Sequence, residues 1–203
     1  IGSFNSCLES AEASGGSDTV KAKEFLKDGV KLLKSPKIKV LKVTDINTTG
    51  LIGPSIRPKP FFAFMKSNGV SEKHNSTASG SFGIGKYAPF AASHLRTVFV
   101  STTYLHDEKT PVTLTQGKAV LTSFKKGEAT HRGTGYWGLT KGYEPLQGAS
   151  LEQLPVWLQR DSSFEGVGTS IYILAVKESE GWLNHLASAI IESYFAKILI
   201  KKL

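Results

Sequence analysis

Apolar residues recur along the chain with two periods, and each period predicts one kind of element. A helical period, with apolar residues three or four positions apart, begins after Asp18, which suits an N-cap, and ends before Pro36. The same period marks four later helices, over residues 61–66, 87–95, 150–160 and 182–198, of which the last is strongly amphipathic. Residues 1–17 are small and polar, and we expect them to form a loop.

Alternating and β-branched residues predict the strands. They fill residues 38–43, 96–104, 112–115, 118–124 and 168–176, and the glycine- and aromatic-rich residues 133–138 return to the same sheet. Gln116 and Gly117 are expected to form a tight turn between two of these strands. We see no internal repeat and no linker, so we expect one domain over residues 1–203. The predicted fold class is α+β, a two-layer sandwich of a mixed β-sheet with helices on one face.

Composition narrows the class of protein. The single cysteine, Cys7, excludes an internal disulfide framework and suits a reducing compartment, so we expect a cytoplasmic protein. No apolar run reaches membrane-spanning length, so no membrane partner is expected. The formal net charge of +8 permits nucleic-acid binding, but the lysines are spread and no aromatic-interleaved basic motif indicates it. One Cys and five scattered His predict no zinc site.

Residues 79–90 carry the first candidate chemistry. Three glycines, Gly80, Gly83 and Gly85, precede Lys86 and a predicted helix. Bare backbone N–H groups can approach an anion closely, and the N-terminal end of a helix favours negative charge. The ammonium of Lys86 adds a point charge. We therefore interpret this stretch as a phosphate-binding loop.

Other motifs compete for the same stretch. The spacing of residues 80–86 matches a P-loop, but Tyr87 stands where that motif has a Mg²⁺-binding Ser or Thr. Residues 83–88 fit a dinucleotide fingerprint, which would indicate an oxidoreductase with Asp107 on the ribose. Both motifs need a buried strand directly before the glycines, whereas residues 71–79 are polar. A lid-type glycine loop fits best, and a glycine-rich turn that only starts a helix is the structural alternative.

Two further candidates lie beside predicted strands. Asp45 follows the first strand, and Asn47 and Gly50 come next. A carboxylate can accept a hydrogen bond from the exocyclic amine of adenine, and a glycine lets the base approach the backbone. Gly168 and Thr169 begin the last strand, where a hydroxyl can reach a purine through water. Taken alone, Asp45 is better explained as a cap or turn residue.

In this order the three motifs resemble those of the GHKL superfamily, which includes gyrase B subunits, large heat-shock chaperone ATPases, MutL mismatch-repair proteins and sensor histidine kinases. Residues 45–50 look like its adenine-binding motif, residues 80–85 like its lid and phosphate loop, and residues 168–171 like its final glycine–threonine motif. More narrowly, the chain resembles uncharacterised bacterial ATP-binding proteins that carry the chaperone-like domain. The resemblance implies the Bergerat ATP-binding fold, with ATP and Mg²⁺ as cofactors. The nucleotide-binding residues that it implies are Asp45, Asn47, Gly50, Gly80, Ser81, Phe82, Gly83, Ile84, Gly85, Lys86 and Thr169.

The chain departs from the family pattern in two places. Its adenine motif is longer than the simplest form, Asp-x-Gly. The first helix of the family carries a Glu that activates water and an Asn that holds Mg²⁺, whereas Glu9, Glu12 and Glu24 have no Asn four residues on. We therefore expect the catalytic helix to lie upstream of Ile1, and the catalytic residues stay unassigned.

The resemblance implies an ATP-binding domain of a Mg²⁺-dependent ATPase that couples nucleotide binding to a conformational change. The alternative is a non-catalytic adenine-nucleotide sensor that regulates a partner domain. Beyond the nucleotide itself, the expected partner is a second copy of the chain or a C-terminal effector domain. No helix pair with a phosphoacceptor histidine is found in the pattern, so a histidine kinase is not expected.

Overall fold

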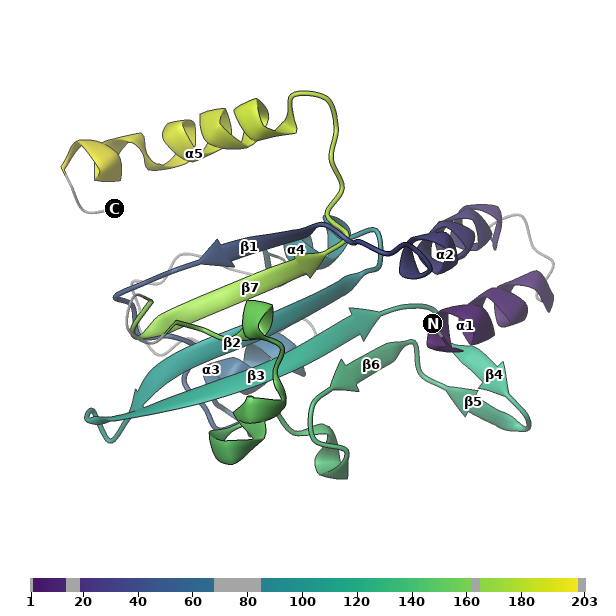
Figure 1. The fold of residues 1–203 in the computed structure, drawn as a ribbon, viewed down its shortest axis with the longest axis horizontal. Coiled ribbons are helices and arrows are strands. Elements are labelled where there is room, and N and C mark those ends of the chain that lie inside the picture. The colour runs from purple at the N-terminus through teal and green to yellow at the C-terminus, as the bar shows by residue number, and fades with distance from the viewer. Residues whose placement is uncertain (1, 14–18, 68–84, 162–164, 201–203) are drawn as a thin grey trace.

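The computed structural model describes residues 2–13, 19–67, 85–161 and 165–200. Within these ranges the fold is α+β, as predicted, and its centre is a five-stranded sheet in the order β1-β7-β2-β3-β6 (Figure 1). The strands are β1 (Val40–Thr44), β2 (Thr97–His106), β3 (Thr110–Val120), β6 (Thr134–Trp137) and β7 (Gly168–Leu174). Every described pair is antiparallel, where we had expected a mixed sheet.

The long hairpin of β2 and β3 corrects one prediction. We had placed a tight turn at Gln116 and Gly117, but both residues lie inside β3, and Gly117 pairs with Phe99. A side chain at this position would meet the ring of Phe99 at 2.7 Å, so the glycine leaves room for an aromatic neighbour. The hairpin turns instead at Asp107 and Glu108, both of which have positive φ.

One face of the sheet is covered by two short helices, α3 (Pro60–Met65) and α4 (Ala88–Ala91), the second preceded by the 3₁₀ turn η1 (Gly85–Tyr87) (Figure 1). Apolar side chains of these helices and of β2 and β3 form a buried core, namely Phe61, Met65, Phe90, Val98, Val100, Tyr104 and Leu114. The helix predicted over 61–66 is confirmed. The helix predicted over 87–95 ends early, because the chain rejoins the sheet through a bridge from Ser93 to Val176.

The opposite face of the sheet carries two 3₁₀ helices, η3 (Gly148–Gln153) and η4 (Val156–Leu158). We had predicted one interrupted helix here, and Pro155 does separate the two segments. Their apolar residues pack on the sheet in a second cluster of Leu146, Leu154, Leu158 and Tyr172. Helical segments therefore cover both faces, although the α-helices that cover the sheet lie on one.

The first two helices, α1 (Gly2–Ala13) and α2 (Thr19–Leu33), pack together at the end of the sheet, beside the hairpin of β4 (Phe124–Lys126) and β5 (Ala129–His131). The prediction of a loop over residues 1–17 is wrong for α1, whereas α2 matches its predicted bounds. Cys7 and Leu26 are fully buried between these elements. The thiol of Cys7 donates to the carbonyl oxygen of Thr122 at 3.2 Å, and burial raises its pKa.

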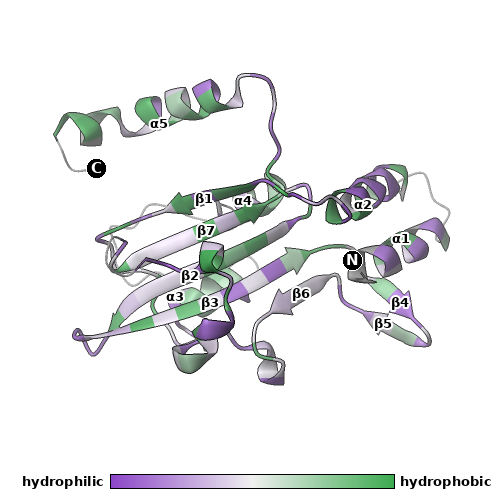
Figure 2. Ribbon diagram, in the orientation of Figure 1, coloured by the Kyte–Doolittle hydropathy of each residue, from purple (hydrophilic) through white to green (hydrophobic). Residues whose placement is uncertain are grey.

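The last helix, α5 (Trp182–Leu199), stands apart from the sheet beyond the edge strand β1 (Figure 1). It is apolar along most of its length, as the green ribbon in Figure 2 shows. Its large apolar side chains are exposed, among them Leu183, Ile191, Phe195 and Leu199. None of the described helices is both long and apolar enough to cross a membrane.

Candidate functional site

Asp45 and Thr169, which come from opposite halves of the sequence, meet at one end of the paired strands β1 and β7. Oδ1 of Asp45 accepts the backbone N–H of Thr169 at 2.5 Å, and the N–H of Asp45 donates to the carbonyl oxygen of Thr169 at 2.9 Å. The hydroxyl of Thr48 also donates to Oδ1 of Asp45, at 2.9 Å. The first and third sequence motifs therefore lie side by side, and two hydrogen bonds to Oδ1 hold the carboxylate of Asp45 in place.

Two glycines allow this close approach. A Cβ on Gly168, whose φ is +150°, would lie 2.4 Å from the carbonyl oxygen of Asp45 and 2.5 Å from its Oδ1. A Cβ on Gly50, whose φ is +64°, would lie 2.4 Å from the carbonyl oxygen of Thr103. Both positions combine a backbone conformation that favours glycine with a contact that leaves no room for a side chain. The glycines of the two motifs are thus required by the local geometry.

A buried threonine ties the two motifs to the central strand β2. The hydroxyl of Thr102 lies 3.1 Å from that of Thr169, and it accepts the backbone N–H of Leu51 at 2.8 Å. Asn47, by contrast, is exposed and has a positive φ of 56°, a conformation that Asn tolerates. No hydrogen bond joins its side chain to Asp45 in the described part of the chain, so Asn47 shapes the loop through its backbone.

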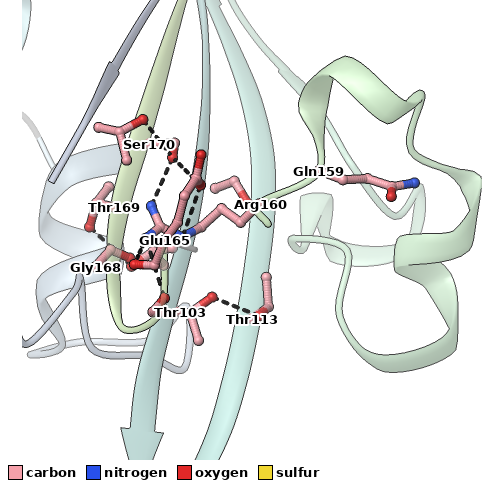
Figure 3. A network of polar contacts seen from close by, with 12 residues as sticks. Thr103, Thr113, Gln159, Arg160, Glu165, Gly168, Thr169 and Ser170 are labelled. Atoms are coloured by element: carbon pink, nitrogen blue, oxygen red, sulfur yellow. Dashed lines mark hydrogen bonds and ion pairs between the residues drawn. The ribbon is translucent and has the colours of Figure 1, made fainter. Parts of the chain in front are cut away.

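Arg160 and Glu165 extend the site on the face of the sheet that carries η3 and η4 (Figure 3). The guanidinium of Arg160 is 2% exposed, and it donates to the hydroxyl of Ser170 at 2.7 Å and to the carbonyl oxygens of Glu165 and Asp45 at 3.0 and 3.3 Å. Its Nε lies 3.7 Å from Oε2 of Glu165, and Glu165 also pairs with Lys42. The network holds the segment before β7 against the end of β1.

Lys42 shows how the charges in this network balance. Burial by itself would lower the pKa of Lys42, but its hydrogen bond to Glu165 and its attraction to Glu165 and Tyr172 raise the pKa above the usual value. Burial raises the pKa of Tyr172. The ammonium of Lys42 therefore stays charged at neutral pH, and its contact with Glu165 stabilises the site.

The network borders a hollow of about 300 Å³, lined among others by Ser101, Thr113, Thr115, Gln159 and Arg160. Hydroxyl groups and one guanidinium could bind a small polar molecule there. A larger hollow of about 480 Å³ lies between α1 and the β4–β5 hairpin, and no predicted site residue lines it. We assign more weight to the smaller hollow because buried polar groups surround it.

The phosphate-binding loop is only partly covered by the structure. Gly80, Ser81, Phe82, Gly83 and Ile84 lie outside the described residues, as does the polar segment 71–79. Gly85 begins η1, and a side chain there would meet nothing within 4 Å. The ammonium of Lys86 donates to the carbonyl oxygens of Ala63 and Ser67, at 3.0 and 2.5 Å, so it also holds the C-terminal end of α3. No described contact joins Lys86 to Asp45 or Thr169.

Sequence reasoning missed Arg160, Glu165 and Lys118. Arg160 and Glu165 lie in an irregular segment, and no spacing rule connects them to Asp45. Lys118 lay in an expected strand and counted as one of many lysines. Nothing in the sequence could have found Arg160 or Glu165, whereas a lysine among apolar strand residues was a signal for Lys118.

The described residues contain no group of three or more His, Cys, Asp or Glu side chains that could hold a metal ion. No protein-family model, no curated protein and no solved structure matches this chain. The site must therefore be interpreted from its own residues.

Proposed function

We propose that the chain is an adenine-nucleotide-binding domain of the GHKL type, and that in its protein it serves a Mg²⁺-dependent ATPase that couples ATP binding to a conformational change. One observation carries the proposal. Asp45 and Thr169 are 124 positions apart, yet two hydrogen bonds join them at the end of β1 and β7. A nucleotide site assembled from these two motifs requires Asp45 and Thr169 to lie close together. Two unrelated turns would have no such requirement.

The geometry of Asp45 suits recognition of an amine. Both described hydrogen bonds to its side chain end on Oδ1, from Thr169 and Thr48. Oδ2 accepts no hydrogen bond from the described residues, and the side chain is exposed. It can therefore accept an N–H of the exocyclic amine of adenine. Gly50, whose φ is +64°, lets the loop after Asp45 pack closely against Thr102 and Thr103, which fixes the backbone beside the carboxylate.

Fewer residues can be assigned to the phosphates and to the metal than to the adenine base. The glycine loop of residues 80–85, with Lys86, is expected to bind the phosphates, and these glycines are outside the described part of the chain. Among the described residues no side-chain cluster fits Mg²⁺, so we assign it no ligand and derive no hydrolytic step. The proposal therefore concerns binding of the nucleotide by this chain.

A non-catalytic nucleotide sensor is the second candidate function. The family uses a Glu followed four residues later by Asn, on its first helix, to activate water and hold the metal. None of Glu9, Glu12 and Glu24 has an Asn at that spacing, and the pair Glu180 and Asn184, which does, lies at the start of the last helix. A chain without this pair could still bind ATP and change the state of a partner domain. A measurement of ATP hydrolysis distinguishes the ATPase from the sensor.

Replacing Asp45 tests the proposal. Asp45→Asn leaves an oxygen acceptor but removes the charge, so ATP affinity should fall by roughly 1–3 kcal/mol, the worth of a hydrogen bond to a charged group. GTP, which presents a carbonyl where adenine has its amine, should bind the wild type more weakly and respond little to the change. Isothermal titration calorimetry with both nucleotides measures the difference.

Asp28→Asn is the matched control, because Asp28 is an exposed carboxylate on α2, and it should leave both affinities unchanged. If the wild type binds ATP and GTP equally, Asp45 does not recognise adenine. If it binds neither nucleotide, the proposed function is wrong.

A further inference from the structure

Lys118 is a buried lysine in the middle of β3. Its residue is 3% exposed, on the face of the sheet that α3 covers. The ammonium donates to the carbonyl oxygen of Met65 at 2.7 Å and lies 5.7 and 5.8 Å from the ring centroids of Phe90 and Tyr136. Cation–π contacts of this kind stabilise a lysine only modestly. The hydroxyl of Tyr136 donates to the same carbonyl oxygen of Met65, at 3.3 Å.

No carboxylate in the described part of the chain forms an ion pair with Lys118. The charge that acts on it belongs to a second cation, Lys86, whose ammonium is bound at the same end of α3. Burial first, and then repulsion by Lys86, lower the pKa of Lys118 to about 8. Burial also lowers the pKa of Lys86. A buried ammonium without a counter-charge is costly, and such groups gather at functional sites.

A second observation comes from Ser67, two residues beyond the end of α3. Its hydroxyl is buried and has no hydrogen-bond partner among the described residues, whereas the large majority of buried side-chain polar atoms in proteins have one. The carbonyl oxygen of the same residue accepts from Lys86. Within the described part of the chain, a hydroxyl without an acceptor and the ammonium of Lys118, which has no carboxylate partner there, thus occur at the same end of one helix.

We infer that Lys118, Lys86 and Ser67 form an anion site at the C-terminal end of α3, and that the site takes a phosphate group. An ammonium has three donors, and Lys118 uses one of them on Met65. A phosphate offers several acceptor oxygens and the missing negative charge. The carbonyl groups at the end of α3 oppose an anion, but the helix has only six residues and its end is already bound by both lysines.

The inference rests on the proposed function only for the source of the phosphate. In that function the group belongs to the tail of the bound nucleotide, and Lys118 is a nucleotide-binding residue that the resemblance does not imply. A free polyphosphate would satisfy the same chemistry. Adenosine, ATP and tripolyphosphate therefore distinguish the two sources.

Calorimetric titration of the whole chain at 0.15 M salt tests the site. Tripolyphosphate and ATP should bind the wild type, and Lys118→Gln should weaken both at least tenfold while leaving adenosine unchanged. Lys118→Arg keeps the charge and should restore most of the affinity. Lys126→Gln is the matched control, because Lys126 is exposed on β4, and it should have little effect.

Proton uptake provides a readout that a purely structural lysine would not change. At pH 8.5 Lys118 is largely neutral in the free protein, and a bound anion should recharge it, so the binding enthalpy should vary with the ionisation enthalpy of the buffer. The titratable groups that act on Lys118 are Lys86 on η1, which repels it, and Tyr136 on β6, whose ring lies beside its ammonium. Tyr87 on η1 in turn acts on Tyr136. Lys118→Gln and Lys118→Arg should both lose the uptake assigned to Lys118.

Unchanged tripolyphosphate and ATP affinity in a folded Lys118→Gln variant would overturn the site. If that variant does not fold, the wild type decides, because absence of proton uptake at pH 8.5 contradicts the inference and its presence supports it. Tripolyphosphate bound as tightly as ATP, with no binding of adenosine, would support the anion site and contradict the adenine site. Adenine-specific binding that Lys118→Gln leaves unchanged would support the adenine site and contradict the anion site.

Discussion

Gly168 is the residue at which the candidate site tolerates least change. A side chain there would collide with both the carbonyl oxygen and Oδ1 of Asp45, and φ is +150°. We expect Gly168→Ala to lower the free energy of unfolding by about 1–3 kcal/mol, the usual cost of such strain, and to separate Asp45 from Thr169. Urea unfolding followed by fluorescence measures the first effect, and ATP titration measures the second.

Gly135→Ala is the control for Gly168→Ala. Gly135 lies on β6, and a side chain at this position would meet nothing within 4 Å. Its stability should change by no more than about 0.5 kcal/mol, as for surface substitutions in general. Equal losses in the two variants would show that the contact with Asp45 is not the cause.

At the residue scale, sequence and structure agree where chemistry is local. Asp45 and Thr169 could be singled out because each follows or begins an apolar strand, and the structure joins them. Lys86 is the opposite case. Its position after the glycines was informative, but the direction of its side chain toward α3 depends on packing that the sequence does not display.

At the scale of elements, α1 and α5 pack differently from what their sequence patterns predicted. The small, polar residues of α1 predicted a loop, yet α1 packs on α2 and buries Cys7. The apolar residues of α5 predicted a helix packed on the sheet. The helix forms, but its residues belong to none of the described core clusters.

Two truncations check this contrast. Removing residues 178–203, and with them α5, should change the urea midpoint of unfolding little, because the core clusters remain complete. Removing residues 1–13, and with them α1, should lower the midpoint clearly, since Cys7 is fully buried and its loss leaves α2 partly uncovered. A large loss on removal of α5 would mean that the helix does contribute to the core.

At the scale of the whole molecule, the proposed function separates binding from turnover. We expect residues 1–203 to bind ATP with no turnover above the buffer background, because none of Glu9, Glu12 and Glu24 in the first two helices has the Asn four residues on that the family pattern requires. Phosphate release measured over several hours, with and without Mg²⁺, tests this. Clear hydrolysis that depends on Mg²⁺ would show that a general base is present and was missed, and would favour the ATPase over the sensor.

The sequence by itself determined the fold class, most of the elements and two parts of the candidate site. These depend on local properties, namely the period of apolar residues, the turn preferences of glycine and proline, and carboxylates or hydroxyls at strand ends. Such signals are visible within ten residues of chain. They placed α2, α3, β2, β7 and α5, whereas Asp45 and Thr169 were selected because three motifs in this order resemble the GHKL pattern.

Only the tertiary structure decided how these parts come together. The continuous strand β3, the helix α1, the Arg160–Glu165 network and the buried ammonium of Lys118 all depend on neighbours that are far away in the sequence. Packing can override weak local preferences, because burying an apolar side chain contributes more free energy than the intrinsic preference of one residue. Gly117 therefore lies inside β3 beside the ring of Phe99 instead of forming the predicted turn, and Lys118 is a buried cation within the same strand.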